Sequence, residues 1–175
     1  MAQAQPYDVI RGLEGGVELR HYPAHTLISI DVRGDFDSAG NLGFGPLVQY
    51  ISGVNSARQK IAMTSPVVQA PHDSQEHTVS FVLPEGSTPE DAPIPSDARV
   101  KVAQQPARDV AALRFSGSWK QARVMEKTQH LLDVLRRQGV TTSGDVFYGR
   151  FDPPGVPPFL RHNEALVPVA KLQGE

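Results

Sequence analysis

The segment VELRHYPAHTLISIDVRG, residues 17–34, is matched later in the chain by VKVAQQPARDVAALRFSG, residues 100–117. One constant shift places Pro23 on Pro106 and keeps the alternation of apolar and polar side chains in phase. Alternate residues of a strand share one face, so each segment predicts two strands with the same side turned toward a core. The proline sits where the first strand is expected to turn back into the second, so each segment predicts a hairpin.

A helix is expected after each of these strand pairs. In the second half, residues 121–137 place apolar side chains three and four positions apart, which is typical of an amphipathic helix. Ser118 is expected to cap the start of this helix, and Gly139 is expected to end it.

The matching helix of the first half has a shorter apolar stripe. Residues 44–51 carry the stripe, which stops before Gly53. Pro46 lacks the backbone N–H that a helix interior needs. The helix is therefore expected either to begin near Gly45, with the proline in its first turn, or to be kinked.

Two further strands should complete each half of the chain. They are expected at residues 60–69, 78–83, 145–151 and 165–170. The order is then ββαββ given twice, with pseudo-repeats at about 17–83 and 100–170, joined by the proline-rich and acidic connector 84–98. Because closure removes exposed sheet edges, we expect a single α+β domain over residues 1–175. Its predicted form is a distorted eight-stranded antiparallel barrel with two flanking helices.

Composition narrows the classes of partner. The 175 residues are 39% apolar and carry a net charge of −2, without the basic surplus typical of nucleic-acid binding, so no nucleic-acid partner is expected. The absence of cysteine excludes disulfides, iron–sulfur clusters and thiolate metal ligands. No apolar run approaches the roughly 20 residues of a membrane span, and no signal-peptide pattern opens the chain. We therefore expect a cytoplasmic protein.

Common catalytic motifs are missing. The sequence has no GxSxG, HExxH or GxxxxGK[ST] pattern, so no catalytic residue is assigned. The six histidines lack the spacing of a metal site, and the metal ligand stays unknown. Tyr148 could serve a hydrolase if it met a carboxylate near a strand end, although solvated surface charge is the simpler interpretation. These carboxylates are Glu18, Asp31, Asp35, Asp152 and Glu164.

Three blocks of the chain resemble the SOUL haem-binding proteins. They are ELRHYP at 18–23, KIAMTSPV at 60–67 and FDPPGVPPFLRHNEALVPV at 151–169. In the last block, Pro158 stands where that family often has tryptophan, and His162 replaces a usual arginine. The resemblance implies a duplicated barrel similar to the effector-binding domains of multidrug regulators. It also implies non-covalent binding of haem or a related tetrapyrrole in a shallow apolar groove beside a helix.

The groove that this resemblance implies can be assigned to residues of the first half as a hypothesis. Apolar side chains would cover the faces of the macrocycle, and basic side chains would pair with its propionates. The candidates are Phe44, Leu47, Val48, Arg58, Lys60 and Met63, with Phe159 and Arg161 as secondary candidates. The plain alternative is that Phe44, Leu47 and Met63 belong to the core.

The role of such binding would be buffering, transport or sensing. The alternative function is a small-molecule hydrolase or an effector-binding module built on the same duplicated barrel. The sequence does not predict the oligomeric state.

Overall fold

The computed structural model describes residues 3–153 and 155–172. Pro154, in the proline-rich block, lies outside the described residues. The chain divides into two compact units. The first unit contains residues 1–5 and 24–106, and the second contains residues 6–23 and 107–175. Each unit joins one antiparallel sheet to one long helix, so the predicted α+β class is confirmed.

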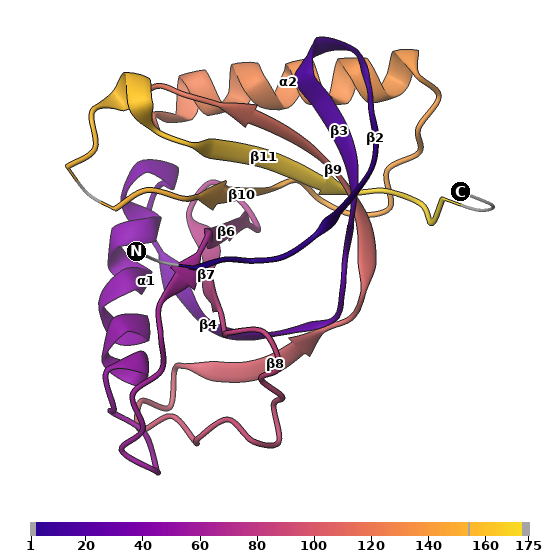
Figure 1. The fold of residues 1–175 in the computed structure, drawn as a ribbon. Coiled ribbons are helices and arrows are strands. Elements are labelled where there is room, and N and C mark those ends of the chain that lie inside the picture. The colour runs from indigo at the N-terminus through magenta and orange to yellow at the C-terminus, as the bar shows by residue number, and fades with distance from the viewer. Residues whose placement is uncertain (1–2, 154, 173–175) are drawn as a thin grey trace. The chain divides into compact units, whose positions relative to one another are not determined.

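The first unit has the strand order β6-β7-β4-β8, with α1 packed on one face (Figure 1). A short parallel pair, β1 with β5, lies outside this order. The elements are β1 (Gln3–Ala4), β4 (His25–Arg33), α1 (Phe36–Ile51), β5 (Thr64–Ser65), β6 (Val67–Pro71), β7 (Glu76–Val82) and β8 (Lys101–Gln105).

Helix α1 starts earlier than the apolar stripe predicted. Asp35 is its N-cap, and its carboxylate accepts a hydrogen bond of 2.9 Å from the backbone N–H of Ser38. This cap satisfies one of the free N–H groups of the first turn and fixes the start at Phe36. The predicted start near Gly45 is therefore wrong, and Pro46 lies inside the helix.

The core of the first unit lies between α1 and the sheet. Gly43 allows the closest approach, because a Cβ atom at this position would lie 2.7 Å from Cβ of Val79 on β7. Fully buried side chains of the helix and of β4 fill the rest. The cluster is Ile28, Ile30, Leu47, Tyr50, Ile51, Val79, Phe81, Leu83 and Val100.

The second unit has the strand order β2-β3-β9-β11-β10, and α2 packs against β9 and β11. The elements are β2 (Asp8–Gly12), η1 (Glu14–Gly16), β3 (Val17–Tyr22), β9 (Arg108–Phe115), α2 (Gln121–Arg137), β10 (Phe147–Arg150), η2 (Pro158–Leu160) and β11 (Asn163–Pro168). Neither α1 nor α2, the two long helices of the described residues, has the length and apolar character needed to cross a bilayer.

Helix α2 has the predicted bounds of residues 121–137. Gly139 adopts a φ of +70° just beyond the C-cap, as predicted for the residue that ends a helix. The backbone N–H of Val140 bonds to the Leu135 carbonyl at 2.9 Å and closes this end. The predicted N-cap is wrong, because Lys120 occupies that position and makes no side-chain cap.

Two predictions about the sheet are wrong. The first concerns the hairpins: β3 pairs with β9, and β4 pairs with β8, so the strands on either side of Pro23 do not pair with each other. The second concerns the barrel, since the sheet of the described residues does not close. Strand β2, which the repeat did not predict, occupies the outer edge of β3, with a register irregularity between Val9 and Arg11.

Candidate functional site

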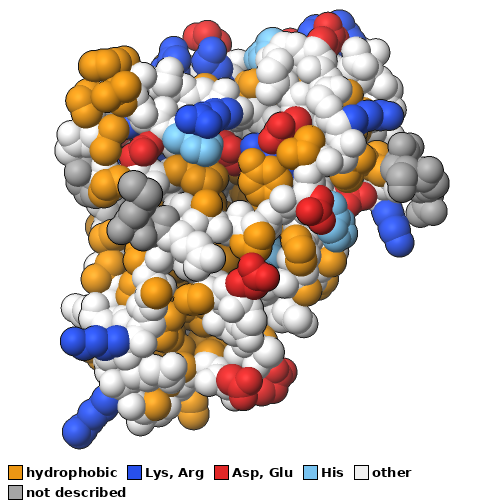
Figure 2. Space-filling view, viewed as in Figure 1, with side chains coloured by type: hydrophobic (Ala, Val, Ile, Leu, Met, Phe, Trp, Pro, Cys, Tyr) orange, Lys and Arg blue, Asp and Glu red, His pale blue; other side chains and the backbone are white. Residues whose placement is uncertain are grey.

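An exposed apolar surface lies on the outer side of α1. The Phe44 ring is 37% exposed, and its edge contacts the ring of Phe81, with the centroids 5.4 Å apart. Val48 is half-buried and lies one turn after Phe44. Leu42 is also exposed, but it lies two positions before Phe44 and so on a different face of the helix. Figure 2 shows hydrophobic side chains over the region where Figure 1 places this helix. Leu47 is fully buried, so it supports this surface from beneath and presents no area to a ligand.

Gly45 keeps the α1 surface flat. A Cβ atom built at Gly45 would meet no heavy atom within 4 Å, so the position opens to solvent. Glycine inside a helix costs roughly 1 kcal/mol relative to alanine. Packing does not require it here, in contrast to Gly43, so the open backbone at Gly45 is available to a flat ligand.

A basic loop follows the C-terminal end of α1. Arg58 and Lys60 are exposed, and neither forms an ion pair with any described residue. Arg58 adopts a φ of +50°, which is unusual for a residue with a side chain. The loop therefore holds two cations in a defined backbone conformation.

Asn55 fixes this basic loop from inside. Its side-chain nitrogen donates to the carbonyls of Tyr50 at 2.8 Å and Gln59 at 2.9 Å. Its side-chain oxygen accepts from the N–H groups of Ala57 at 3.2 Å and Gln59 at 3.0 Å. Asn55 is buried, so these bonds are protected from water, and the side chain connects the end of α1 to the loop that bears Arg58.

Met63 returns the chain to the same core. The Ile61 N–H bonds to the Ile51 carbonyl at 2.8 Å, which ties the segment after the basic loop to the end of α1. Met63 and Val48 are both partly buried against the core cluster of the first unit. Four of the predicted residues thus lie on α1 or on the loop that follows it, Phe44 and Val48 on the helix and Arg58 and Lys60 on the loop. Met63 comes after this loop and is partly buried against the core cluster.

The two secondary candidates belong to the second unit. Phe159 lies on η2 and is 74% exposed. Arg161 is half-buried, and its Nε donates to the Val156 carbonyl at 2.9 Å.

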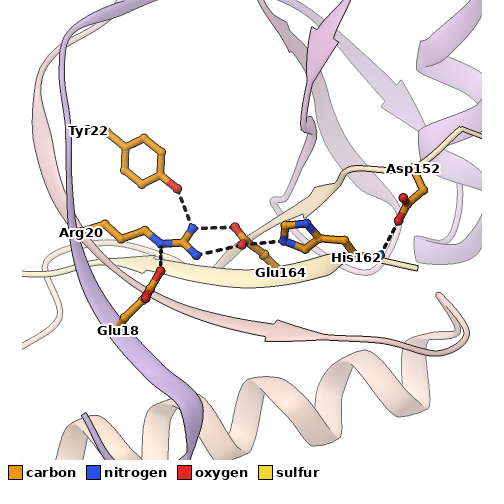
Figure 3. A network of polar contacts seen from close by, with 6 residues as sticks. All are labelled: Glu18, Arg20, Tyr22, Asp152, His162 and Glu164. Atoms are coloured by element: carbon orange, nitrogen blue, oxygen red, sulfur yellow. Dashed lines mark hydrogen bonds and ion pairs between the residues drawn. The ribbon is translucent and has the colours of Figure 1, made fainter. Parts of the chain in front are cut away.

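The second unit also contains a buried charge network (Figure 3). The Arg20 guanidinium on β3 donates to both carboxylate oxygens of Glu164 on β11, at 2.7 and 2.9 Å. Arg20 also donates to the Tyr22 hydroxyl and to Glu18. The His162 Nε2 donates to Glu164 at 2.8 Å, since an ionised carboxylate can only accept.

Opposing effects set the charges of this network. Burial by itself would raise the pKa of Glu164, but the hydrogen bonds from His162 and Arg20 outweigh it, and the pKa is lowered. Burial likewise opposes the charge of Arg20, yet the Glu164 carboxylate raises the pKa of the guanidinium. Burial raises the pKa of Tyr22 well above its ordinary value. The network therefore holds an ionised Arg20–Glu164 pair beside a neutral phenol.

The predicted hydrolase would need Tyr148 beside a carboxylate. The Tyr148 hydroxyl lies 2.9 Å from the Thr128 hydroxyl on α2, and its ring contacts Trp119 edge-on. The strand register places Tyr148 and Glu164 on opposite faces of the sheet. The buried carboxylate is thus held by Arg20 and faces away from Tyr148.

His21 on β3 has a carboxylate partner on the neighbouring strand β9. Its Nδ1 lies 2.8 Å from Oδ1 of Asp109, whose side chain is nearly buried. Burial would raise the pKa of Asp109, but the bond with His21 outweighs it and lowers the pKa. Donation from Nδ1 fixes the neutral ring in the tautomer with its lone pair on Nε2. No cluster of three metal-ligating His, Asp or Glu side chains occurs in the described part of the chain.

Sequence reasoning missed several of these residues. Gly45 was treated only as a helix start, although a glycine within an apolar stripe is a signal for a close backbone approach. Asn55 follows a glycine-ended helix, where its amide could have been expected to fix a turn. The pairing of Arg20 with Glu164 joins residues 144 positions apart, and no local pattern could have predicted it.

Solved structures share this fold. The C-terminal domain of EcmrR gives a TM-score of 0.69 at 13% identity, over 89% of this chain and 98% of that one. A hydrolase from Listeria innocua gives a TM-score of 0.60 at 12% identity, over 91% of this chain and 94% of that one.

Proteins related to this chain in sequence are named as heme-binding proteins. Heme-binding protein 2 of Mus musculus is 31% identical over 141 residues, which are 77% of this chain and 68% of that protein. Heme-binding protein 1 of Xenopus laevis is 29% identical over 164 residues, covering 89% of this chain and 86% of that protein. The model of the family described as SOUL heme-binding protein matches residues 2–168. With nearly its whole length matched, this chain belongs to the SOUL heme-binding protein family.

Proposed function

We propose that this chain binds haem or a related tetrapyrrole non-covalently on the exposed side of α1. Family membership supports haem as the ligand class. The observation that carries the placement is the open position at Gly45, one turn before the half-buried Val48, on the helix that leads into a loop whose two cations form no ion pair with the described residues.

The residues of this surface fit the chemistry of the group. A tetrapyrrole presents two flat apolar faces, whose burial contributes about 25 cal/mol per Å². Phe44 and Val48 offer apolar contact, and Gly45 lets a flat face approach the helix backbone. Arg58 and Lys60 would pair with the propionates, and Asn55 positions the loop that bears them. The Met63 thioether would supply a polarizable contact at the edge of the tetrapyrrole ring.

The proposal extends to the cellular role of the binding and to the origin of the fold. The role would be haem buffering, transport or sensing in the cytoplasm. Phe159 and Arg161 stay secondary candidates from the sequence, and the proposed surface on α1 does not include them. The chain would be a single domain that arose by duplication, which is supported by the shared strand order β8-β4-β7-β6 in one unit and β3-β9-β11-β10 in the other.

Titration of the purified protein with ferric haem tests the placement. Gly45→Gln adds a side chain over the α1 surface without entering the core, and we expect the affinity to fall about tenfold. Arg58→Glu with Lys60→Glu should weaken binding by a similar factor and reduce its salt dependence. Arg33→Glu is the matched control, because this exposed arginine precedes the opposite end of α1, about 24 Å away along the 16-residue helix.

The Soret band reports the outcome. Absence of a spectral change in the wild-type protein at micromolar haem would overturn the proposed ligand. Equal affinities for wild type, Gly45→Gln and the double charge reversal would overturn the placement on α1 while leaving haem as the ligand.

A further inference from the structure

A proline-rich turn of the second unit presents two adjacent large apolar side chains to solvent. Phe159 is 74% exposed and Leu160 is 62% exposed, although both belong to the short helix η2. We call this pair the apolar tip. Figure 2 shows a hydrophobic cluster at the corner where Figure 1 places the yellow turn before β11. Isolated exposed apolar residues are ordinary, but two neighbours at the end of one turn need a reason.

The turn that bears the tip is well fixed. The Leu160 N–H bonds to the Pro157 carbonyl at 2.9 Å, and the Arg161 N–H bonds to the Pro158 carbonyl at 3.1 Å. The Pro158 carbonyl also accepts from the Gly117 N–H at 2.8 Å, which ties the turn to the segment before α2. Proline restricts φ at two positions as well. The tip is therefore preorganised, and little ordering is needed when it meets a partner.

Four cationic side chains lie on the segments that hold this turn. Arg161 follows the tip directly, and Lys120 is exposed at the start of α2. Arg123 donates to the Ser116 carbonyl at 2.6 Å, next to Gly117. The Arg150 guanidinium lies over the Trp119 ring, 4.9 Å from its centroid.

No carboxylate of the described residues neutralises these cations. Burial lowers the pKa of Arg150, and the Arg161 charge lowers it further. Within residues 3–153 and 155–172, none of the four forms an ion pair. The four cations are Lys120, Arg123, Arg150 and Arg161.

We propose that this turn docks the protein on a bilayer that contains anionic lipids, with Phe159 and Leu160 inserted at the level of the headgroups. Two apolar side chains beside four cations combine the two contributions that hold peripheral proteins on such surfaces. A projecting tip enters a soft lipid layer without a preformed pocket, whereas a protein partner would have to supply a matching cavity. The proposal does not depend on haem binding.

Co-sedimentation with vesicles tests it on the full-length protein without haem. Vesicles of phosphatidylcholine that contain phosphatidylserine should bind the wild type, and pure phosphatidylcholine should not. Phe159→Ser with Leu160→Ser should weaken binding about a hundredfold, since each side chain contributes about tenfold. Val9→Ser, at an exposed apolar residue of β2, is the matched control and should bind as the wild type does.

Insertion can be measured directly with Phe159→Trp. The native Trp119 is buried, so the added indole dominates any spectral response to lipid. Its emission should shift to the blue on anionic vesicles and be quenched by lipids with brominated acyl chains. Equal binding to neutral and anionic vesicles, or no quenching, would overturn the proposal. If serine substitutions leave vesicle binding intact while Arg161→Gln with Lys120→Gln abolishes it, the surface recognises polyanions such as acidic proteins, and the membrane tip is wrong.

Discussion

Arg20 and Glu164 form a bidentate ion pair, at 2.7 and 2.9 Å, between residues 144 positions apart. Both side chains are almost fully buried, and they join β3 to β11 across the intervening strand β9. A buried pair of this kind contributes little when compared with an apolar pair of the same shape, but either charge left alone is costly. The pair therefore specifies the arrangement of these strands more than it stabilises them.

Replacing Arg20 or Glu164 alone should destabilise the protein more than expected from the double replacement, because a single replacement leaves one buried charge without its partner. We expect Arg20→Met or Glu164→Met to lower the free energy of unfolding by about 3–5 kcal/mol, because each leaves a buried charge. The double variant should lose less than the sum of the two. Urea unfolding checks this cycle. Arg33→Met with Glu76→Met removes an exposed pair at 3.4 Å and should change stability little. Additive losses at Arg20 and Glu164 would contradict the coupling.

Glu164 should make the free energy of unfolding depend on pH in the acidic range. Its pKa is lowered in the folded protein, so the unfolded chain binds its proton first as the pH falls below the ordinary value of 4.5. The stabilisation is present above that pH and is lost progressively below it. Urea midpoints measured from pH 7 to pH 3 should fall less steeply in Glu164→Gln than in the wild type. Parallel slopes would show that other carboxylates carry the acid sensitivity.

The neighbouring glycines of α1 should respond oppositely to alanine. Gly45→Ala should stabilise the protein by up to about 1 kcal/mol, because the methyl group enters open space and alanine favours the helix. Gly43→Ala should destabilise it, because the new Cβ would lie 2.7 Å from Cβ of Val79. Thermal unfolding of the two variants provides matched controls for each other. Similar midpoints would mean that α1 packs less closely on β7 than described.

Asn55 should fix the backbone conformation of the loop that bears Arg58 and Lys60. Asn55→Ala removes four hydrogen bonds to backbone groups, one buried and three part-buried, and we expect a loss of about 2–4 kcal/mol in unfolding free energy. Haem affinity should fall with it, since Arg58 and Lys60 lose their fixed loop. Asn41→Ala, on the exposed side of α1, is the control and should preserve stability. Unchanged haem affinity in a folded Asn55→Ala protein would separate the loop from the ligand.

Local sequence patterns predicted the helices and strands better than they predicted which strands pair with each other. Helix α2 and the stop at Gly139 followed from spacing and from glycine's tolerance of positive φ, both of which are properties of neighbouring residues. The start of α1 was missed because its first two turns lack an apolar stripe, and the cap at Asp35 sets it instead. Pairing was missed because alternation reveals which side of a strand faces the core but not which strand lies beside it.

In the candidate site, too, local spacing predicted some features, while others depend on the folded structure. Spacing and resemblance predicted Phe44, Val48 and Met63 as one surface. In the structure, Val48 and Met63 pack against one core cluster and Phe44 contacts Phe81 of that cluster, while their contact with a ligand stays a prediction. Leu47 could not be separated from them by sequence, because an apolar stripe does not show where burial becomes complete. The amide of Asn55 acts through backbone groups of its neighbours, whose geometry exists only in the folded loop.

The passage of β3 into β4 at Pro23, and of β8 into β9 at Pro106, gives each sheet a strand from the distant half of the chain. A chain cut within the connector 84–98 would yield an amino-terminal fragment that lacks β8 and a carboxyl-terminal fragment that lacks β2 and β3. The fragments would therefore complement each other by reciprocal strand exchange, and two intact copies could exchange the same strands. The amino-terminal half alone lacks β8 for the first unit and β9, β10 and β11 for the second, so neither strand order can be completed before the carboxyl-terminal half is made.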